Sequence, residues 1–247
     1  MNVLSVKGVR LGAGRPKTIV SLMDTQVPDL IASAQRAVAA GADLLEWRLD
    51  FAPELAGEVH DLSCALPHTP LIATFRSTGQ GGQSELSADA YEQLLRQLIA
   101  TNCIDIIDIE LGLGDARVRA LVQEARAHDV LSIVSHHDFD KTPTKAEMVE
   151  LLTHMAALGA SIPKLAVMAH DMQDCLRLME ATDATAAELE QPLITMAMGK
   201  AGALSRLAGE SCRSAATFCA LERPSAPGQV ELSQAIACLD QLHAIMG

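Results

Sequence analysis

The chain has 247 residues, of which 49% are hydrophobic and 20% charged, and its formal charge is −12 at pH 7. These proportions exclude a disordered chain and predict a globular protein with a sizeable core. An acidic surface repels phosphate groups, so we expect neither nucleic acid nor a membrane as a partner. No apolar run approaches the roughly 20 residues of a membrane span. The opening MNVLSVKGVRLGAG also lacks the apolar core of a signal peptide.

The cysteines indicate a reducing environment. There are six, at Cys64, Cys103, Cys175, Cys212, Cys219 and Cys238. They form no CxxC pair and have no zinc-ligand spacing. Most have apolar neighbours, which favours reduced, buried thiols. Because reduced thiols are typical of the cytoplasm, the sequence predicts a cytoplasmic protein.

Short apolar runs bounded by polar residues predict eight β-strands. In chain order they are TIVSLM (18–23), DLLEWRLD (43–50), PLIATFRS (70–77), IDIIDIEL (104–111), VLSIVSHHDF (130–139), IPKLAVMA (162–169), PLITMAMG (192–199) and SAATFCAL (214–221). Several of these runs are almost wholly apolar, as expected for strands that are buried on both faces.

The segments between the strands have the composition and the three-to-four spacing of helices. Examples are residues 27–41, 87–102 and 114–129. Helix boundaries are predicted by a capping box at Thr144 and Glu147, by helix-ending glycines at Gly41 and Gly159, and by Ser233 as the cap of the last helix.

Alternating strands and helices predict parallel strands, and eight such units match a closed (β/α)8 barrel. A doubly wound open sheet is the alternative, but SLMDTQVPD follows the first strand where that fold would carry GxGxxG. VLSVKGVRLG precedes the first unit and is predicted to form a hairpin that closes the bottom of the barrel. Without a linker or repeat, residues 1–247 are expected to form one (β/α)8 TIM-barrel domain.

Charged and polar residues gather at the ends of the predicted strands, where barrel enzymes place their active sites. They are Glu46, Arg48 and Asp50, then Arg76, then Asp108 and Glu110, and then His136, His137 and Asp138. Any one of them could form a structural ion pair. Burying all of them at one end would cost several kcal/mol, so the pattern predicts a functional site.

The paired histidines suit acid–base chemistry better than a metal site. Adjacent residues His136 and His137 face opposite sides of a strand, so one of them enters the barrel. A metal-dependent barrel hydrolase is one alternative function, but the sequence has no HxH motif, which disfavours it. A histidine beside Lys164 on the next strand suits proton transfer. Apolar surroundings disfavour a charged lysine and promote a nucleophilic amine, which points to a Schiff base with a carbonyl substrate.

At these residues the sequence resembles a known enzyme family nearly from end to end. The motifs are VSLM, EWRLD, TFRS, DIEL, SHHDF with KTP, IPKLAVM, ITMAMGKAGALSRLAGE, SAATF and SAPGQ. In this order they resemble the type I 3-dehydroquinate dehydratases, Schiff-base barrel enzymes of the shikimate pathway. The resemblance implies a hydro-lyase that converts 3-dehydroquinate to 3-dehydroshikimate by syn elimination, without metal or cofactor, in a homodimer.

The resemblance also implies residue roles. Lys164 would form an imine with the C3 ketone. His137 would remove a proton from C2 and later protonate the departing C1 hydroxyl. Arg206 would clamp the substrate carboxylate, which suits the rigid fork of a guanidinium.

Further positions match substrate-binding residues of the family. Those for the ring hydroxyls are Glu46, Arg48 and Arg76; those of a loop that closes over the ligand are Ser225 and Gln229; Ser21 also matches, and Met196 and Met198 would form pocket walls or core. Closure of such a loop would exclude water from the reacting groups.

The chain departs from the family pattern at two positions. Gln80 stands where many members carry a glutamate, and His136 where many carry an asparagine. Gln80 can orient His137 but brings no charge, so we expect Glu46 or Glu110 to supply part of the electrostatic role.

A different class of function is a barrel that senses dehydroquinate or quinate without converting it. Such a sensor would need neither Lys164 nor His137, and this chain retains both. The enzyme reading is therefore favoured.

Overall fold

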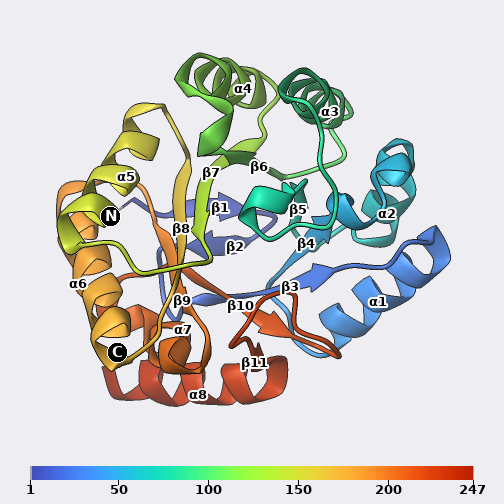
Figure 1. The fold of residues 1–247 in the computed structure, drawn as a ribbon. Coiled ribbons are helices and arrows are strands. Elements are labelled where there is room, and N and C mark those ends of the chain that lie inside the picture. Colours follow the sequence, from blue (N-terminus) through green and yellow to red (C-terminus); the bar gives the residue numbers. More distant parts are fainter. Residues whose placement is uncertain (1, 247) are drawn as a thin grey trace.

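All eight predicted strands form and run parallel around a barrel (Figure 1), in a computed structural model that describes residues 2–246. They are β3 (Lys17–Leu22), β4 (Leu44–Arg48), β5 (Leu71–Thr74), β6 (Ile106–Glu110), β7 (Leu131–Asp138), β8 (Ile162–Met168), β9 (Ile194–Met198) and β10 (Ala216–Ala220). Each strand pairs with its neighbour in sequence, β10 also pairs with β3, and the short β11 (Val230–Glu231) pairs with β10. A bridge between Leu193 and Ser214 joins the remaining edge. The closed-barrel prediction is confirmed, and the open sheet is excluded.

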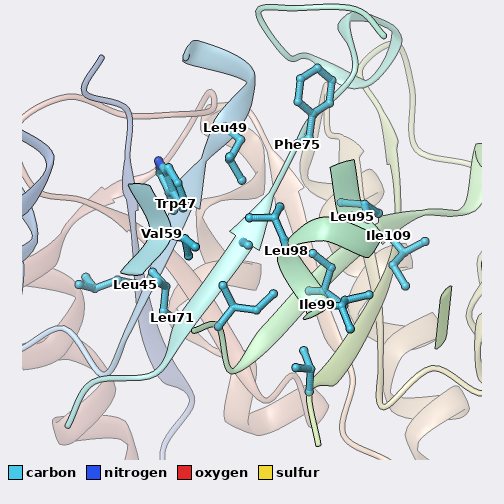
Figure 2. Packing of buried hydrophobic residues seen from close by; sticks show 14 of the residues in the cluster. Leu45, Trp47, Leu49, Val59, Leu71, Phe75, Leu95, Leu98, Ile99 and Ile109 are labelled. Carbon is cyan, nitrogen blue, oxygen red and sulfur yellow. The ribbon is translucent and has the colours of Figure 1, made fainter. Parts of the chain in front are cut away.

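Helices surround the strands on the outside (Figure 1). They are α1 (Val27–Ala39), α2 (Val59–Ala65), α3 (Ala88–Ala100), α4 (Asp115–Ala127), α5 (Lys145–Ala157), α6 (Met172–Glu188), α7 (Ala203–Leu207) and α8 (Leu232–Met246). Figure 2 shows outward-facing strand residues such as Leu45, Trp47 and Leu71 within the apolar layer that includes Val59 of α2 and Leu98 of α3. Alternate residues of each strand therefore face the helices, and the residues between them face the barrel interior.

Two of the predicted helix signals are confirmed. Thr144 and Glu147 form both hydrogen bonds of a capping box at the start of α5. Gly41 and Gly159 follow α1 and α5 with φ angles of +94° and +96°, which side chains rarely allow.

The predicted cap of the last helix is wrong. Ser233 lies inside α8, which begins at Leu232. The carboxylate of Glu231 accepts hydrogen bonds from the backbone N–H groups of Ser233 and Gln234 instead. Sequence could not separate these neighbouring residues because an acidic side chain also satisfies the free N–H groups of a first turn.

The bottom of the barrel interior is an apolar layer closed by the N-terminal hairpin. The strands contribute Ile19, Leu44, Ile72, Ile106, Ile133, Ile162, Ile194 and Ala216. Strands β1 (Leu4–Val6) and β2 (Val9–Leu11) pair antiparallel, and their apolar side chains pack against this layer. Figure 1 shows the hairpin across the ring of strands, as predicted. The layer forms a dry floor beneath the opposite end of the barrel.

The next inward-facing layer is polar. Two residues beyond the apolar floor, the strands place Ser21, Glu46, Thr74, Asp108, Ser135 and Lys164. Because side chains alternate with a period of two, these groups stand directly above the floor. The fold thus collects them at the carboxyl ends of the strands.

Among residues 2–246, no helix has both the length and the apolar character that crossing a bilayer requires.

The hairpin closure predicts a large cost for Leu11→Ala, because Leu11 is 1% exposed within the floor layer. Loss of a buried leucine costs about 2–5 kcal/mol. Urea unfolding should show this loss, whereas Leu176→Ala on the outer surface of α6, 38% exposed, should change stability by about 0.5 kcal/mol or less. Equal, small effects of both changes would contradict the role of the hairpin.

Candidate active site

Glu46 and Lys164 of the polar layer line a pocket of about 460 Å³ at the carboxyl ends of the strands. Its lining includes Glu46, Arg48, Arg76, Gln80, His137, Lys164, Met196, Met198, Arg206, Ser225 and Gln229. Eight of the nine predicted site residues therefore meet in one cavity. The ninth, Ser21, lies behind this lining and contacts it through hydrogen bonds.

Lys164 is the buried cation of the pocket. Its Nζ lies 2.9 Å from Asp108 Oδ2, 3.7 Å from Glu46 Oε1 and 4.5 Å from the centre of the Phe218 ring. The sequence predicts apolar surroundings for this amine, but in the structure two carboxylates and an aromatic face adjoin it. Although Lys164 lies early in β8, its side chain reaches the pocket.

Asp108 joins Lys164 to Arg76. Arg76 Nη2 lies 2.9 Å from Asp108 Oδ2, and the Ser135 hydroxyl donates to Asp108 Oδ1 at 2.6 Å. Burial alone would raise the pKa of Asp108, but Arg76 and Lys164 outweigh it and hold the pKa at about 2. Asp108 is therefore an anion that fixes two cations.

Arg76 is also bound to Glu110, whose carboxylate accepts from the guanidinium at 2.9 Å and from the Ser77 hydroxyl at 2.7 Å. Glu46 accepts from Ser21 at 2.6 Å and from Thr74 at 3.0 Å. Both carboxylates are thus held by hydrogen bonds from neighbouring side chains.

His137 enters the pocket from β7, whereas the neighbouring His136 is outside its lining, as alternation predicts. Burial lowers the pKa of His137 well below 6.5, and the positive charges of Arg76 and Lys164 lower it further. His137 is therefore neutral at neutral pH. Its contact is with Gln80, whereas Glu46 and Glu110 hydrogen-bond to other residues.

Arg206 is nearly unpartnered despite being buried. It is 1% exposed, and its one hydrogen bond runs from Nη2 to the carbonyl oxygen of Pro227 at 3.2 Å. Its Nε and Nη1 have no partner among residues 2–246. Burial lowers the pKa of Arg206 to about 10, which still leaves it charged at neutral pH. A buried guanidinium with free donors is suited to bind an anion.

The loop between β10 and β11 covers part of the mouth. Ser225 donates from its hydroxyl to that of Ser21 at 3.0 Å, and Gln229 Nε2 donates to Ser225 at 2.8 Å. Since Ser21 also donates to Glu46, this loop is connected to the polar layer. Arg48, at the end of β4, forms a two-pronged pair with Asp50 at 2.7 and 2.8 Å.

Among residues 2–246, no group of three or more histidine, cysteine or acidic side chains is arranged to hold a metal ion.

Sequence reasoning named Asp108 as a polar strand end but missed its place at the centre of the site. Two-residue alternation could have indicated this place. Asp108 lies two residues after Ile106 and two before Glu110, and all three face the barrel interior. Phe218 was missed as well, and its parity with Ala216 could have indicated it.

Fold and site together define a (β/α)8-barrel protein with an enzyme-like pocket for a small anionic molecule. The model of the type I 3-dehydroquinase family matches residues 18–246. The 3-dehydroquinate dehydratases of Listeria welshimeri and Bacillus subtilis are each 41% identical to the chain, over 98% of its length and at least 98% of their own. The type I 3-dehydroquinate dehydratase from Clostridium difficile, solved with covalently modified comenic acid, superposes with a TM-score of 0.94 at 37% identity, covering 99% of this chain and 98% of that one. The chain belongs to the type I 3-dehydroquinase family.

The lack of partners for Arg206 predicts that Arg206→Met increases the free energy of unfolding, since it removes an uncompensated buried charge. Arg48→Met is the matched control, because it leaves the buried carboxylate of Asp50 without its counter-charge. It should lower the free energy of unfolding by about 3–5 kcal/mol. Urea unfolding of both variants provides the measurement. A loss of stability in Arg206→Met as large as that in Arg48→Met would mean that Arg206 already has its partners.

Proposed function

We propose that this chain dehydrates 3-dehydroquinate to 3-dehydroshikimate, a lyase reaction of the shikimate pathway. The observation that carries the proposal is that Lys164 and His137, on neighbouring strands, line one pocket with the free guanidinium donors of Arg206. A nucleophilic amine, a neutral base and an anion clamp are what this reaction requires. Membership of the type I family supports the same reaction.

The first step joins Lys164 to the substrate. Nζ attacks the C3 carbonyl, a C–N bond forms, and one amine hydrogen moves to the carbonyl oxygen to give a carbinolamine. The proton that Lys164 first released then returns to this hydroxyl, which leaves as water to give an iminium. Because Nζ is ion-paired, it must first release a proton, and Glu46 Oε1 at 3.7 Å is the acceptor we assign. Arg206 holds the substrate carboxylate and so orients the ring towards Lys164.

The second step is the syn elimination. Neutral His137 removes a proton from C2, and the electron pair moves towards the iminium nitrogen. The electron pair then returns from nitrogen to form the C1=C2 double bond as the C1–O bond breaks, and His137 gives its proton to the departing hydroxyl, which leaves as water. Addition of water to the imine then releases 3-dehydroshikimate and restores Lys164.

The remaining site residues bind and enclose the substrate in this scheme. Arg48, Arg76 and Glu46 face the ring hydroxyls. Ser225 and Gln229 close over the ligand, and Ser21 holds Ser225 in the closed position through the hydroxyl contact at 3.0 Å. A closed loop keeps bulk water away from the imine until elimination is complete.

Borohydride reduction in the presence of 3-dehydroquinate tests the proposal. Mass spectrometry of the digested protein should locate a covalent adduct on Lys164 that is absent in Lys164→Ala. His137→Ala should still form the adduct but lose product formation, because imine formation and proton transfer are separable roles. If the unaltered protein forms neither adduct nor 3-dehydroshikimate, the proposed reaction is wrong.

We also propose that the chain acts as one domain in a cytoplasmic homodimer. Six free cysteines are consistent with a reducing compartment, and the family resemblance suggests the dimer. Light scattering coupled to size exclusion should give twice the 26.2 kDa mass of the chain. A monomeric mass at micromolar concentration would contradict the dimer and leave the reaction unaffected.

A further inference from the structure

A tight turn carries Gln80 to the wall of the pocket. In this turn the carbonyl oxygen of Ser77 accepts from the backbone N–H groups of Gln80 and Gly82 at 3.0 and 2.9 Å. A Cβ at Gly82 would lie 1.8 Å from the carbonyl oxygen of Arg76, and one at Gly81 would lie 2.2 Å from the Phe139 ring. Only glycine fits at either position, so the turn has little freedom.

The turn is also anchored to the barrel. Glu110, at the end of β6, accepts from the backbone N–H of Ser77 at 3.0 Å and from its hydroxyl at 2.7 Å. Glu110 is held in turn by Arg76 at 2.9 Å. The position of Gln80 is therefore set by the same ion-pair network that holds Lys164.

The contact between Gln80 and His137 defines which ring nitrogen carries the proton. The backbone N–H of His137 lies 3.0 Å from Gln80 Oε1, and a backbone N–H can only donate, which identifies this atom as the amide oxygen. The same oxygen lies 3.0 Å from His137 Nδ1. An amide oxygen only accepts, so Nδ1 bears the hydrogen. In a neutral ring, Nε2 then keeps its lone pair.

The charges around His137 disfavour a second proton. Three cations face the ring, Arg48 from β4, Arg76 after β5 and Lys164 from β8, and His136 adjoins it on β7. The nearby carboxylates are bound to groups other than this ring. Glu46 accepts hydrogen bonds from Ser21 and Thr74, and Asp138 accepts them from the backbone of Asp140 and Lys141. Asp108 pairs with Lys164 and Arg76, and Glu110 with Arg76 and Ser77. Gln80 adds an acceptor to this environment without adding negative charge.

We propose that Gln80 is a positioning residue that locks His137 in the Nδ1–H form without stabilising its imidazolium. In the proposed reaction, on which this inference rests, His137 then starts each turnover as a base at Nε2. Once it has taken the C2 proton, the unsupported imidazolium is a strong acid and returns that proton readily to the departing hydroxyl. A carboxylate at position 80 would reverse this balance, because it would stabilise the protonated ring.

Nitrogen-15 NMR of the ligand-free protein tests the lock without any substrate. His137 should show a protonated Nδ1 and an unprotonated Nε2 at pH 7. Gln80→Met keeps the size of the side chain but removes the acceptor, and should give a mixture of the two forms. Gln83→Met, in the same loop and outside the pocket lining formed by the described residues, is the control. A proton on Nε2 in the unaltered protein, or no change in Gln80→Met, would overturn the proposal.

The pH dependence of kcat/KM tests whether the lack of a negative charge at position 80 matters for His137. A base works only when unprotonated, so the lowered pKa of His137 keeps the unaltered enzyme active below pH 6.5. Gln80→Glu should raise this pKa and move the acidic limb upward by about one to three pH units. Gln83→Glu adds the same charge without the contact and should leave the limb in place. Coinciding profiles of the two variants would overturn the proposal.

These results separate the inference from the reaction. If Lys164 forms no adduct with 3-dehydroquinate, the proposed function fails, whereas the NMR result still decides whether Gln80 locks His137.

Discussion

The site depends on one buried carboxylate, that of Asp108. It binds Lys164 and Arg76 at 2.9 Å each and accepts from Ser135 at 2.6 Å. Burial of an anion is tolerated only when it is fully paired, so each of these partners has a defined position. The amine of Lys164 is thereby held in one position. Arg76 also pairs with Glu110, and Glu110 binds the turn that carries Gln80.

The pocket is a cationic site in an acidic protein. Although the chain has a formal charge of −12, its pocket holds Arg48, Lys164 and Arg206, whose Nε and Nη1 have no partner among residues 2–246. Arg48 and Lys164 are paired with buried carboxylates, so the unfavourable charge is that of Arg206 until an anion binds. Stability is therefore reduced at Arg206 in return for binding an anion. The pKa of His137 is lowered by burial and by the positive charges of Arg76, Lys164 and Arg48.

Periodicity made the fold and much of the site predictable. Short apolar runs located all eight strands, and two-residue alternation placed Glu46 and Arg48 on one side of their strand. The sequence predicted apolar surroundings for Lys164 because it shows only the neighbours along β8, whereas Asp108 reaches Lys164 from β6, two strands away. The contact of Gln80 with His137 was expected only from the family resemblance, since it depends on a turn closed by two glycines that no local pattern indicates. Contacts across the barrel follow from packing, which no local pattern encodes.

The central claim is a distribution of protons around Asp108, and neutron diffraction from crystals of the ligand-free protein at pH 7 tests it most directly. The account predicts three hydrogens on Lys164 Nζ, none on the carboxylate of Asp108, and a single ring hydrogen on Nδ1 of His137. A neutral amine beside a protonated Asp108, or a ring hydrogen on Nε2, would contradict it.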